Sequence, residues 1–567
     1  MSVLDRAKQE VAVALAKALS VPGVSPDELV KPPQADMGDL SYPCFGLAKS
    51  MKASPAAIAK DVAAKVVSGG MIGEVRAAGP YVNFYFDRKA FATAVLGEVL
   101  GRSVDFGDAL ERKNERIMIE YGSPNTHKEI HVGHLRNFCL GLSVVRLCRA
   151  AGYDVVPVSY IGDIGAHVAK CLWALKKFHV GEEPPENRGK FLGQIYTEAT
   201  NKVEEDETVK TEIAEVLRKL EARDPAWDAL WRETRQWSID ELNAVFAELS
   251  CVFERMYFES EVEARGKALV KELLEAGIAK EGERGAIIVD LESEGLGIFL
   301  ALKSDGSALY STKELALAEK KFSDFENIAR SVHIVDNRQS LYFQQFFATL
   351  KRMGFDKKMT HLAYEFVTLK EGAMSSRKGN IVTYEDFRDE MLRMTAEETA
   401  KRHPDWDPGR VRDVSWAIAE GAMKFGMLKQ DTERAIVFDM NAALSFDGFT
   451  GPYIQYAHAR LSSILAKADE DTVSVCKASD DPREFALLRL VADLPAIVAA
   501  AAEAYKPSLL AQYLFELAQA SNDFYRDVPV LSAPDDDRCR RLVIVSAARV
   551  AIARGLFLLG IRAPEEM

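Results

Sequence analysis

The chain lacks a CxxC cysteine pair, which would suggest a metalloprotein, and a long apolar run, which would suggest a membrane protein. Its seven cysteines are scattered along 567 residues and none forms a CxxC pair, which argues against a zinc site. No uncharged apolar run reaches the roughly 18 residues of a membrane-spanning helix. The opening residues show the amphipathic, acid-containing pattern of a helix rather than of a signal peptide, so we expect a cytoplasmic protein without membrane association.

An excess of positive charge is also missing, because the formal net charge is −13. Such a chain is not expected to bind nucleic acid indiscriminately, although a shaped RNA site with local basic residues is compatible with it. A hydrophobic content of 48% and a charged content of 28% are typical of soluble globular proteins, and the length predicts more than one domain.

A polar segment, SPNTHKEIHVGHLR at 123–136, carries the most informative pattern. An apolar run precedes it at 117–119, and a helical pattern at 135–150 and a second apolar run at 155–158 follow. This order predicts a βαβ unit whose loop lies at the carboxyl end of a strand, where ligands bind in open parallel sheets. His131 and His134, at the helix start, can donate hydrogen bonds to phosphate oxygens. Alone, the short HxGH pattern is equally typical of a helix cap.

Later strand and helix patterns predict a second βαβ half. Strands are expected at 285–290, 297–302, 332–336 and 362–369, and helices from Thr312 and Gln339. We therefore expect an α/β fold with a Rossmann-type, doubly wound parallel sheet.

Three domains are expected along the chain. Residues 1–105 form an α+β domain with a strand at 81–86, and residues 106–384 form the Rossmann domain. A charged, amphipathic helical pair is inserted in that second domain at about 170–250. Residues 385–567 have helical periodicity almost throughout and form an all-helical domain.

A second polar loop, KEGAMSSRKGN at 370–380, follows the last predicted strand. Its small residues give flexibility, and Arg377 and Lys378 supply positive charge. Such a loop can close over a triphosphate and stabilise a leaving pyrophosphate. On its own it is typical of a solvated basic turn, but its place in the second half makes it a plausible partner for the histidine loop.

The two loops resemble the signatures of class I aminoacyl-tRNA synthetases, HVGH at 131–134 and MSSRK at 374–378. The chain is more specifically similar to the arginyl-tRNA synthetase family over nearly its whole length. The segments that carry this resemblance follow in the family's order: MGDLSYPCFGLAK (37–49), AAGPYVNFYF (77–86), EYGSPNTHKEIHVGHLRN (120–137), IGDIG (161–165), DGSALYSTKELA (305–316), VDNRQSLYFQQFF (335–347), AMSSRKGNIV (373–382) and FDGFTGPYIQYAHARL (446–461).

The resemblance implies a two-step reaction of L-arginine, ATP and tRNA(Arg). Arginine and Mg2+-ATP give arginyl-adenylate and pyrophosphate, and the arginyl group then moves to the terminal ribose of tRNA(Arg). The family forms no covalent enzyme intermediate, so catalysis is expected to come from positioning and from charge stabilisation on the phosphates. The resemblance also implies that activation requires bound tRNA. We expect a monomer and no structural metal.

The resemblance assigns phosphate and nucleotide contacts within the two loops. His131, His134, Lys128, Arg377 and Lys378 are expected to act on the phosphates, and Gly133, Met374, Ser375 and Ser376 to complete the ATP site together with the two histidines. The family's lysines are replaced at Ala373 and Ser376. Lys128 is therefore expected to carry more of the charge stabilisation than in other class I enzymes.

Five residues match the family's arginine contacts: Glu120, Asn125, Tyr310, Glu314 and Gln339. Carboxylates and amide oxygens suit a planar guanidinium with five donors. Glu314 stands where the family usually has Asp, and it also completes the pattern of a helix capping box with Ser311, which is an alternative role. Asn125 has the alternative role of shaping the turn after Pro124.

Six residues match the family's tRNA contacts: Tyr81 and Asn83 for the D-loop, and Tyr456, Arg460, Tyr525 and Met567 for the anticodon loop. Tyr456 and Arg460 are four apart and share a helix face. A place on the sheet surface or in its core is an alternative for the first two, and buried core for Tyr525.

Other functions are compatible with parts of these patterns. A cysteinyl-type synthetase would need a cysteine zinc site, and small HxGH nucleotidyltransferases lack a helical tail. A catalytically silent tRNA-binding paralogue is suggested by Ala373 and Ser376, whereas the intact His131, His134 and Asn125 argue against it.

Overall fold

The computed structural model describes residues 1–355, 357–370, 382–468 and 481–567. Its chain divides into two compact units. Unit 1 comprises Met1–Glu111, Ser445–Ala501 and Leu509–Met567, and unit 2 comprises Arg112–Leu444 and Ala502–Ser508. The domain limits expected near residues 105 and 384 stay predictions.

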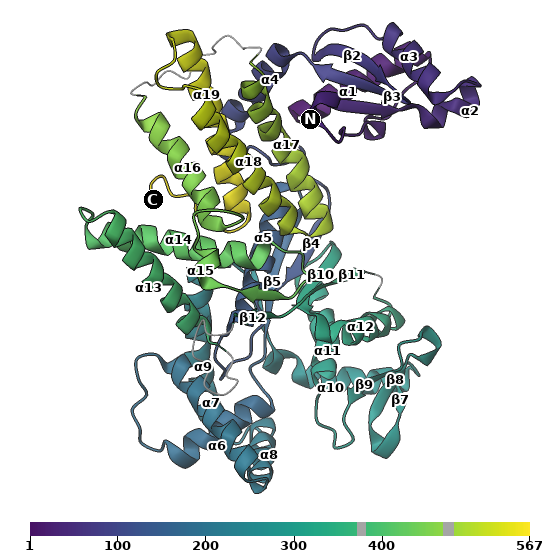
Figure 1. Cartoon of the computed structure of the whole chain (residues 1–567). Helices are drawn as coiled ribbons and strands as arrows, with labels where there is room; N and C mark the ends of the chain where they lie inside the picture. Colours follow the sequence, from purple (N-terminus) through teal and green to yellow (C-terminus); the bar gives the residue numbers. More distant parts are fainter. Residues whose placement is uncertain (356, 371–381, 469–480) are drawn as a thin grey trace. The chain divides into compact units, whose positions relative to one another are not determined.

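Unit 2 is built on a five-stranded parallel sheet with the order β11-β10-β4-β5-β6 (Figure 1). Its strands are β4 (Arg116–Glu120), β5 (Asp154–Ile161), β6 (Arg255–Phe258), β10 (Ile328–Asp336) and β11 (Lys358–Tyr364). The first strand lies in the middle, the next two follow on one side, and the last two lie on the other. The winding therefore reverses between β4 and β10, which confirms the predicted doubly wound sheet. The strands expected at 285–290 and 297–302 are not part of it, because β8 (Ile287–Asp290) and β9 (Ile298–Leu302) pair antiparallel in a separate sheet with β7 (Lys280–Glu281).

Four helices pack against this sheet. They are α5 (Val132–Ala150), α10 (Glu259–Glu275), α11 (Tyr310–Asp324) and α12 (Ser340–Arg352). Met118, Val156 and Tyr257 from three neighbouring strands share one buried core with Leu315 and Phe346 from two of the helices. Strand residues buried on both faces form continuous apolar runs, which is why Ile117–Ile119 was readable as a parallel strand.

The strand predicted at 362–369 is wrong as a single element. It is split into β11 and a short strand, β12 (Val367–Leu369), which pairs in parallel with β13 (Ile436–Phe438) in a separate sheet. Between them the Glu365 carbonyl accepts a hydrogen bond from the buried Arg136, and the Glu365 N–H donates to Thr432 O at 2.9 Å. These bonds turn the backbone away from the main sheet. β13 also adds a short strand to the otherwise helical segment after residue 385.

The helical insertion has a core of its own. Its helices are α6 (Ala166–Phe178), α7 (Arg188–Glu205), α8 (Thr208–Glu221) and α9 (Pro225–Glu248), which Figure 1 shows grouped together. Trp173, Phe191, Ile213, Leu220 and Trp231 pack in one buried cluster drawn from all four helices. The amphipathic pattern was correct, but four helices, α6 to α9, rather than a pair occupy the range of about 170–250.

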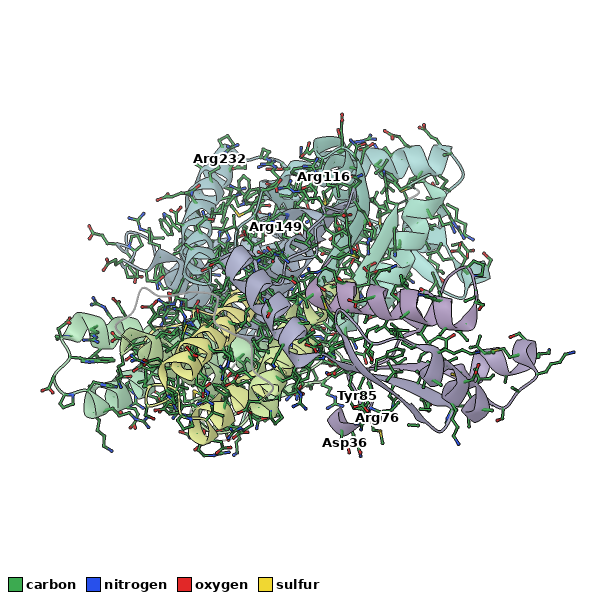
Figure 2. All side chains as sticks on the ribbon, turned by 90° about the horizontal axis from the view of Figure 1, so that it is seen from above. Asp36, Arg76, Tyr85, Arg116, Arg149 and Arg232 are labelled. Carbon is green, nitrogen blue, oxygen red and sulfur yellow. The ribbon has the colours of Figure 1, made fainter. Side chains whose placement is uncertain are left out.

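The amino-terminal part of unit 1 is a three-stranded antiparallel sheet with the order β1-β3-β2. Its strands are β1 (Leu40–Pro43), β2 (Ile72–Ala78) and β3 (Tyr81–Phe86), and its helices are α1 (Val3–Leu19), α2 (Ala48–Met51), α3 (Pro55–Lys65) and α4 (Arg88–Arg102). On this sheet the Arg76 guanidinium lies 4.6 Å from the Tyr85 ring centroid, and the Tyr85 hydroxyl donates to Asp36 O at 2.9 Å (Figure 2). The strand predicted at 81–86 is confirmed.

The rest of unit 1 is helical: α16 (Gly451–Ala466), α17 (Pro482–Ala504), α18 (Pro507–Asp527) and α19 (Asp535–Leu558). Among the described residues, α17 is long and apolar enough to cross a membrane by length and composition alone. Half of that stretch is buried in the protein, and core helices of folded domains pass the same test. Asp493 on α17 is also paired with Arg489 and, at 3.0 Å, with Lys31.

Candidate active site

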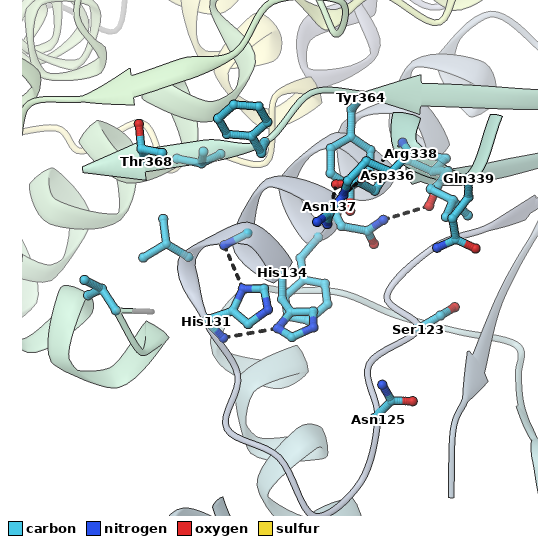
Figure 3. Close-up of a pocket in the computed structure, with 18 of the residues that line it drawn as sticks. Ser123, Asn125, His131, His134, Asn137, Asp336, Arg338, Gln339, Tyr364 and Thr368 are labelled. Atoms are coloured by element: carbon cyan, nitrogen blue, oxygen red, sulfur yellow. Dashed lines mark hydrogen bonds and ion pairs between the residues drawn. The ribbon is translucent and has the colours of Figure 1, made fainter. Parts of the chain in front are cut away.

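A cavity of about 720 Å³ opens at the carboxyl ends of β4 and β10, where the winding of the sheet reverses (Figure 3). Its size suits a small ligand. The predicted residues that line it are Glu120, Asn125, His131, Gly133, His134, Tyr310 and Gln339. Segments far apart in the sequence are therefore brought to one site, at the place where open α/β sheets bind ligands.

His131 and His134 begin the helix α5 as a reciprocal cap. The Gly133 N–H donates to His131 Nδ1 at 3.1 Å, and the His131 N–H donates to His134 Nδ1 at 3.1 Å (Figure 3). The two rings are stacked with centroids 3.7 Å apart. Because both Nδ1 atoms accept, each neutral ring carries its proton on Nε2. The two histidines therefore do cap the helix. Because the capping bonds use only the Nδ1 atoms, neither Nε2–H group takes part in the cap.

The electrostatics of the pair keep both rings uncharged. Burial, helped by the nearby Lys128 charge, lowers the pKa of His131 to about 4. Burial and the neighbouring His131 lower the pKa of His134 well below its usual value. Gly133 permits the arrangement, since a Cβ there would lie 2.9 Å from atoms of the His131 ring. At neutral pH the site offers two neutral donors.

Lys128 lies beside the site rather than in its lining. Its Nζ is 4.9 Å from the centroid of the Tyr196 ring on α7, a cation–π distance. Its charge nevertheless lowers the pKa of His131 and His134. The ammonium is therefore close enough to affect the pKa of both histidines.

The second loop falls largely outside the described residues, and so do the predictions on Ala373, Met374, Ser375, Ser376, Arg377 and Lys378. The nearest described residues on either side, Lys370 and Val382, both line the cavity. Lys370 Nζ pairs with Asp439 at 2.7 Å, and the Val132 N–H donates to Val382 O at 3.2 Å. Both flanks of the loop are thus fixed at the cavity.

Glu120 is already compensated inside the protein. It is 2% exposed, its carboxylate is paired with the buried Lys321, and its Oε1 lies 3.3 Å from His333 Nδ1. Burial lowers the pKa of His333 well below its usual value, so this imidazole is neutral at pH 7. Glu120 lines the cavity and is paired with Lys321, whose pKa burial lowers to about 7.

Glu314 has the opposite character. It is 1% exposed, and neither carboxylate oxygen has a partner in hydrogen-bonding geometry among the described residues, although the Tyr310 hydroxyl lies near enough to act on its pKa. Burial raises the pKa of Glu314 to about 7, with the Tyr310 hydroxyl opposing the shift and Glu259 adding to it. A buried carboxylate without a cationic partner is costly, so Glu314 would be stabilised by a cation. Glu314 is not among the residues that line the cavity, whereas Tyr310 is.

The capping alternative for Glu314 is wrong. Helix α11 begins at Tyr310, and the Leu309 N–H donates to Thr312 Oγ1 at 2.9 Å. The Ser311 hydroxyl donates to the Leu300 carbonyl of β9 (Ile298–Leu302) instead of serving the helix start. Glu314 therefore has no role at the helix end.

Two tyrosines that the sequence analysis did not single out surround this carboxylate. The Tyr310 ring lies 5.5 Å from Tyr342 and 6.2 Å from Tyr160, between centroids. The hydroxyls of Tyr160 and Tyr342 are buried without a partner among the described residues. Tyr342 belongs to the VDNRQSLYFQQFF segment at 335–347, but an aromatic residue in a helical pattern predicts only a place in the hydrophobic core.

Asn125 is held against the end of β5. A β-bridge joins Asn125 to Gly162, and a Cβ at Gly162 would lie 2.1 Å from Asn125 Oδ1. The turn-shaping role and a place in the cavity lining therefore coexist. Gln339 ends the short helical turn Asn337–Gln339 that follows β10, and its position also faces the cavity.

Asn137 is a cavity residue that sequence reasoning missed. The Gly122 N–H donates to Asn137 Oδ1 at 2.6 Å, and Asn137 Nδ2 donates to Ile334 O at 2.7 Å. This buried amide joins the ends of β4 and β10 across the point where the winding reverses. Its spacing was a usable signal, because a residue three after His134 lies on the same helix face.

The D-loop predictions have different outcomes in the amino-terminal sheet. Tyr81 is 37% exposed and meets Phe45 edge to face, with ring centroids 5.6 Å apart. Asn83 is only 5% exposed, and its Oδ1 accepts a hydrogen bond from Ser41 at 2.7 Å. The structure thus places Asn83 in the core, which does not support its direct contact with tRNA, whereas Tyr81 stays available.

Three of the anticodon predictions come together in unit 1. An Arg460 nitrogen donates to the Tyr456 hydroxyl at 2.9 Å, and the guanidinium lies 5.7 Å from the Tyr525 ring centroid. Tyr525 is 45% exposed, so the buried-core alternative for it is wrong. The tail that ends at Met567 is tied to α16, because Gln455 Nε2 donates to Arg562 O at 2.9 Å.

Comparison with known proteins gives three family matches. The model described as "tRNA synthetases class I (R), catalytic domain" matches residues 96–440, "DALR anticodon binding domain" matches 454–567, and "Arginyl tRNA synthetase N terminal domain" matches 5–86. An arginine–tRNA ligase from Bdellovibrio bacteriovorus is 40% identical over 551 residues, which cover 95% of this chain and 94% of that protein.

Solved structures agree with these matches. The arginyl-tRNA synthetase of Thermus thermophilus is similar with a TM-score of 0.81 and 29% identity, over 99% of this chain and 100% of that one. The enzyme from Plasmodium falciparum has a TM-score of 0.79 at 18% identity, over 99% of each chain, and shows the shared fold. The chain therefore belongs to the arginyl-tRNA synthetase family of class I aminoacyl-tRNA synthetases.

Proposed function

We propose that the protein activates L-arginine with ATP and transfers the arginyl group to the terminal ribose of tRNA(Arg), with the cavity below His131 and His134 as its active site. The observation that carries the assignment of the amino-acid site is the unpartnered, buried carboxylate of Glu314. Family membership supports the reaction, and Glu314 supports the place of the guanidinium within the structure.

The charges around Glu314 favour a monocationic side chain. Glu120 is paired with Lys321 and Glu259 with Lys313, all four of them buried. Glu314 is left without a cationic partner among the described residues. A guanidinium supplies one positive charge and a fork of donors, which can bond both oxygens of Glu314. The buried hydroxyls of Tyr160 and Tyr342 offer further acceptors for the same group.

In the first step a carboxylate oxygen of arginine attacks the α-phosphorus of ATP, and pyrophosphate leaves. The Nε2–H groups of His131 and His134 donate to phosphate oxygens as charge builds on them, and Lys128 adds a positive charge. In the second step the ribose hydroxyl attacks the arginyl carbonyl carbon and gives its proton to a phosphate oxygen of the adenylate, and AMP leaves with the bonding electron pair. The protein positions both reactants and forms no bond to either.

Mg2+ would enter with the nucleotide. Within the described ranges, no group of three or more His, Cys, Asp or Glu side chains is arranged to hold a metal ion. The donor set therefore fits a Mg2+ ion coordinated mainly by triphosphate oxygens, as is usual for this ion. It would neutralise charge on those oxygens. The monomeric state and the cytoplasmic location stay predictions from the sequence.

The contacts of Arg460 support a tRNA surface in the helical part of unit 1. Its guanidinium is held by the Tyr456 hydroxyl and by Asn522 Oδ1, the latter at 3.0 Å, beside the exposed Tyr525 ring. A fixed cation next to an exposed aromatic ring suits an unstacked base and its phosphate. We therefore assign Tyr456, Arg460 and Tyr525 to the anticodon loop.

The test is arginine-dependent exchange between ATP and pyrophosphate, with and without tRNA, and with lysine, cysteine and glutamate as control substrates. We expect exchange with arginine alone, and only when tRNA is present. Absence of exchange with every amino acid in both conditions would instead identify a catalytically silent tRNA-binding paralogue.

A further inference from the structure

His127 occupies an unfavourable backbone conformation inside the signature loop. It lies between Asn125, which lines the cavity, and Lys128, whose charge is felt there. Its φ of 59° is in the left-handed region, and its side chain is fully buried. A residue with a side chain persists in that region only where its surroundings hold it. The groups that hold His127 come mainly from outside the loop.

Helix α9 supplies two of the three hydrogen bonds. The His127 N–H donates to Ser238 Oγ at 2.9 Å, and His127 Nε2 lies 2.8 Å from Thr234 Oγ1. Thr234 and Ser238 are four residues apart and face the same side of the helix. The third bond joins His127 Nδ1 to Thr126 Oγ1 at 2.9 Å. The helical insertion thus reaches directly into the signature loop.

The partners define which ring nitrogen carries the proton. The Thr234 hydroxyl donates to Leu230 O at 2.8 Å, so it accepts from His127 Nε2–H. A neutral ring then has an unprotonated Nδ1, which accepts from the Thr126 hydroxyl at 2.9 Å in competition with that hydroxyl's longer bond to Gly162 O at 3.2 Å. Burial also lowers the pKa of His127 to about 3, which agrees with a neutral ring. The ring is therefore a neutral, fully bonded link between the loop and α9.

The other side of the loop is fixed to the end of β5. The Thr126 N–H donates to Gly162 O at 2.9 Å, and the Gly162 N–H donates to Pro124 O at 3.2 Å. Asn125, between these two residues, packs closely against Gly162. The backbone from Pro124 to His127 is therefore held between β5 and α9. This backbone carries the Asn125 side chain, which lines the cavity.

We propose that His127 is a positioning residue, which uses Thr234 and Ser238 of α9 to fix the loop so that Asn125 meets arginine and Lys128 reaches the phosphates. His127 does not touch the substrate, and its effect on the reaction passes through Asn125 and Lys128. The proposal rests on the proposed function, and it makes the helical insertion a part of the active-site machinery.

The test changes α9 and leaves the signature loop intact. Thr234→Val keeps the shape and removes the acceptor of the His127 bond, whereas Thr234→Ser keeps the hydroxyl. Thr197→Val is the matched control, because the Thr197 hydroxyl makes the same kind of bond, to Gly193 O at 3.1 Å on α7. Steady-state kinetics of tRNA-dependent exchange and thermal unfolding are measured for each variant and for the unmodified protein.

We expect Thr234→Val to lower kcat/KM for arginine by roughly five- to tenfold, as for one lost hydrogen bond, with the KM for tRNA unchanged. Thr234→Ser restores the activity, and Thr197→Val stays within about twofold, as usual away from a special site. His127→Asn, which tolerates a left-handed backbone but is too short to reach Thr234, should resemble Thr234→Val. It tests the same link if Thr234→Val fails to fold.

A double variant separates positioning from general destabilisation. In an Asn125→Ala background, Thr234→Val should cause no further rise in the KM for arginine, because its effect passes through Asn125. Equal kinetics for Thr234→Val and Thr197→Val, or full multiplication of the two effects in the double variant, would overturn the proposal. An unmodified protein without exchange activity would overturn the proposed function itself, and the two failures are thus distinct.

Discussion

Glu120 and Glu314 are both buried carboxylates assigned to arginine, yet only Glu120 has its charge balanced. Lys321 pairs with Glu120, whereas neither oxygen of Glu314 accepts a hydrogen bond within the described parts of the chain. The difference assigns the two residues different tasks. If the protein acts as proposed, Glu314 is the carboxylate that the guanidinium stabilises most, whereas Glu120 lines the cavity beside Lys321.

Arginine binding should weaken in acid because of Glu314. Its pKa in the empty site is raised to about 7 by burial, so the carboxyl is protonated below that pH and cannot pair with a guanidinium. The dissociation constant should be about tenfold larger at pH 6 than at pH 8, with little change above pH 8. Calorimetric titration of arginine in buffers of different ionisation enthalpy measures both the affinity and the proton released.

Variants at Glu314 define this effect. Glu314→Gln should weaken arginine binding by roughly 10²- to 10³-fold, because a buried charge loses its partner, and should abolish the pH dependence between 6 and 8. Glu314→Asp keeps the charge and should keep the pH dependence. A pH profile of the Gln variant that matches that of the unmodified protein would show that another group titrates.

Lys128 should matter far more for activation than its neighbour Lys170. Both ammonium groups lie over the Tyr196 ring, at 4.9 Å and 5.2 Å from its centroid. Only Lys128 is expected to act on the phosphates, so Lys128→Ala should lower the exchange rate by about 10²-fold. Lys170→Ala is the matched control and should stay within about twofold. Near-normal exchange in the Lys128 variant would move the charge stabilisation to other cations.

Gly162→Ala should impair arginine use without changing the backbone. A Cβ at this position would lie 2.1 Å from Asn125 Oδ1, so the amide must move away. We expect the KM for arginine to rise roughly tenfold, equivalent to about 1.4 kcal/mol. Gly97→Ala on α4, where nothing lies within 4 Å of the added Cβ, should have no effect on activity. The same steady-state exchange assay measures both.

A second substitution tests the cause. When Asn125→Ala is already present, Gly162→Ala has no amide to displace and should add no further loss. An additional rise in the KM for arginine in that background would mean that the added methyl group acts through another neighbour, such as Glu259, whose Oε1 lies 3.5 Å from it.

Tyr525 should contribute to tRNA binding through its ring. It is 45% exposed beside the Arg460 guanidinium, and stacking on one base contributes about 1–3 kcal/mol. Tyr525→Ala should therefore raise the KM for tRNA(Arg) by at least about fivefold in aminoacylation, and Tyr525→Phe should behave like the unmodified protein. Equal kinetics for the Ala and Phe variants would remove this residue from the anticodon site.

The cavity was predictable because motif order and sheet topology are tightly linked. The segments around His131 and Gln339 both follow strands, and a doubly wound sheet brings the carboxyl ends of β4 and β10 side by side. The start of α5 was equally readable from its polar loop. What the sequence could not show was which polar groups are satisfied, because that depends on partners far along the chain, such as Lys321 for Glu120.

The wrong local interpretations have tertiary causes. The capping box of Ser311 and Glu314 does not form because the Ser311 and Thr312 hydroxyls bind carbonyls of β9, Leu300 and Ala301. Asn83 is buried because β3 is the central strand of its sheet and pairs on both edges, so its polar side chain bonds Ser41. Local rules are overruled wherever a distant strand offers a better partner.

The division of the chain into units has a consequence for its synthesis. Unit 1 combines the first 111 residues with helices that begin after Ser445, and Phe91 packs on Phe485 with ring centroids 5.6 Å apart. Unit 2 is almost wholly one continuous segment between them. On the ribosome, the sheet β1-β3-β2 can form early, but contacts such as that of Phe91 with Phe485 must wait for nearly the whole chain. The cavity of unit 2 can therefore be complete before the amino-terminal segment meets the carboxyl-terminal helices of unit 1.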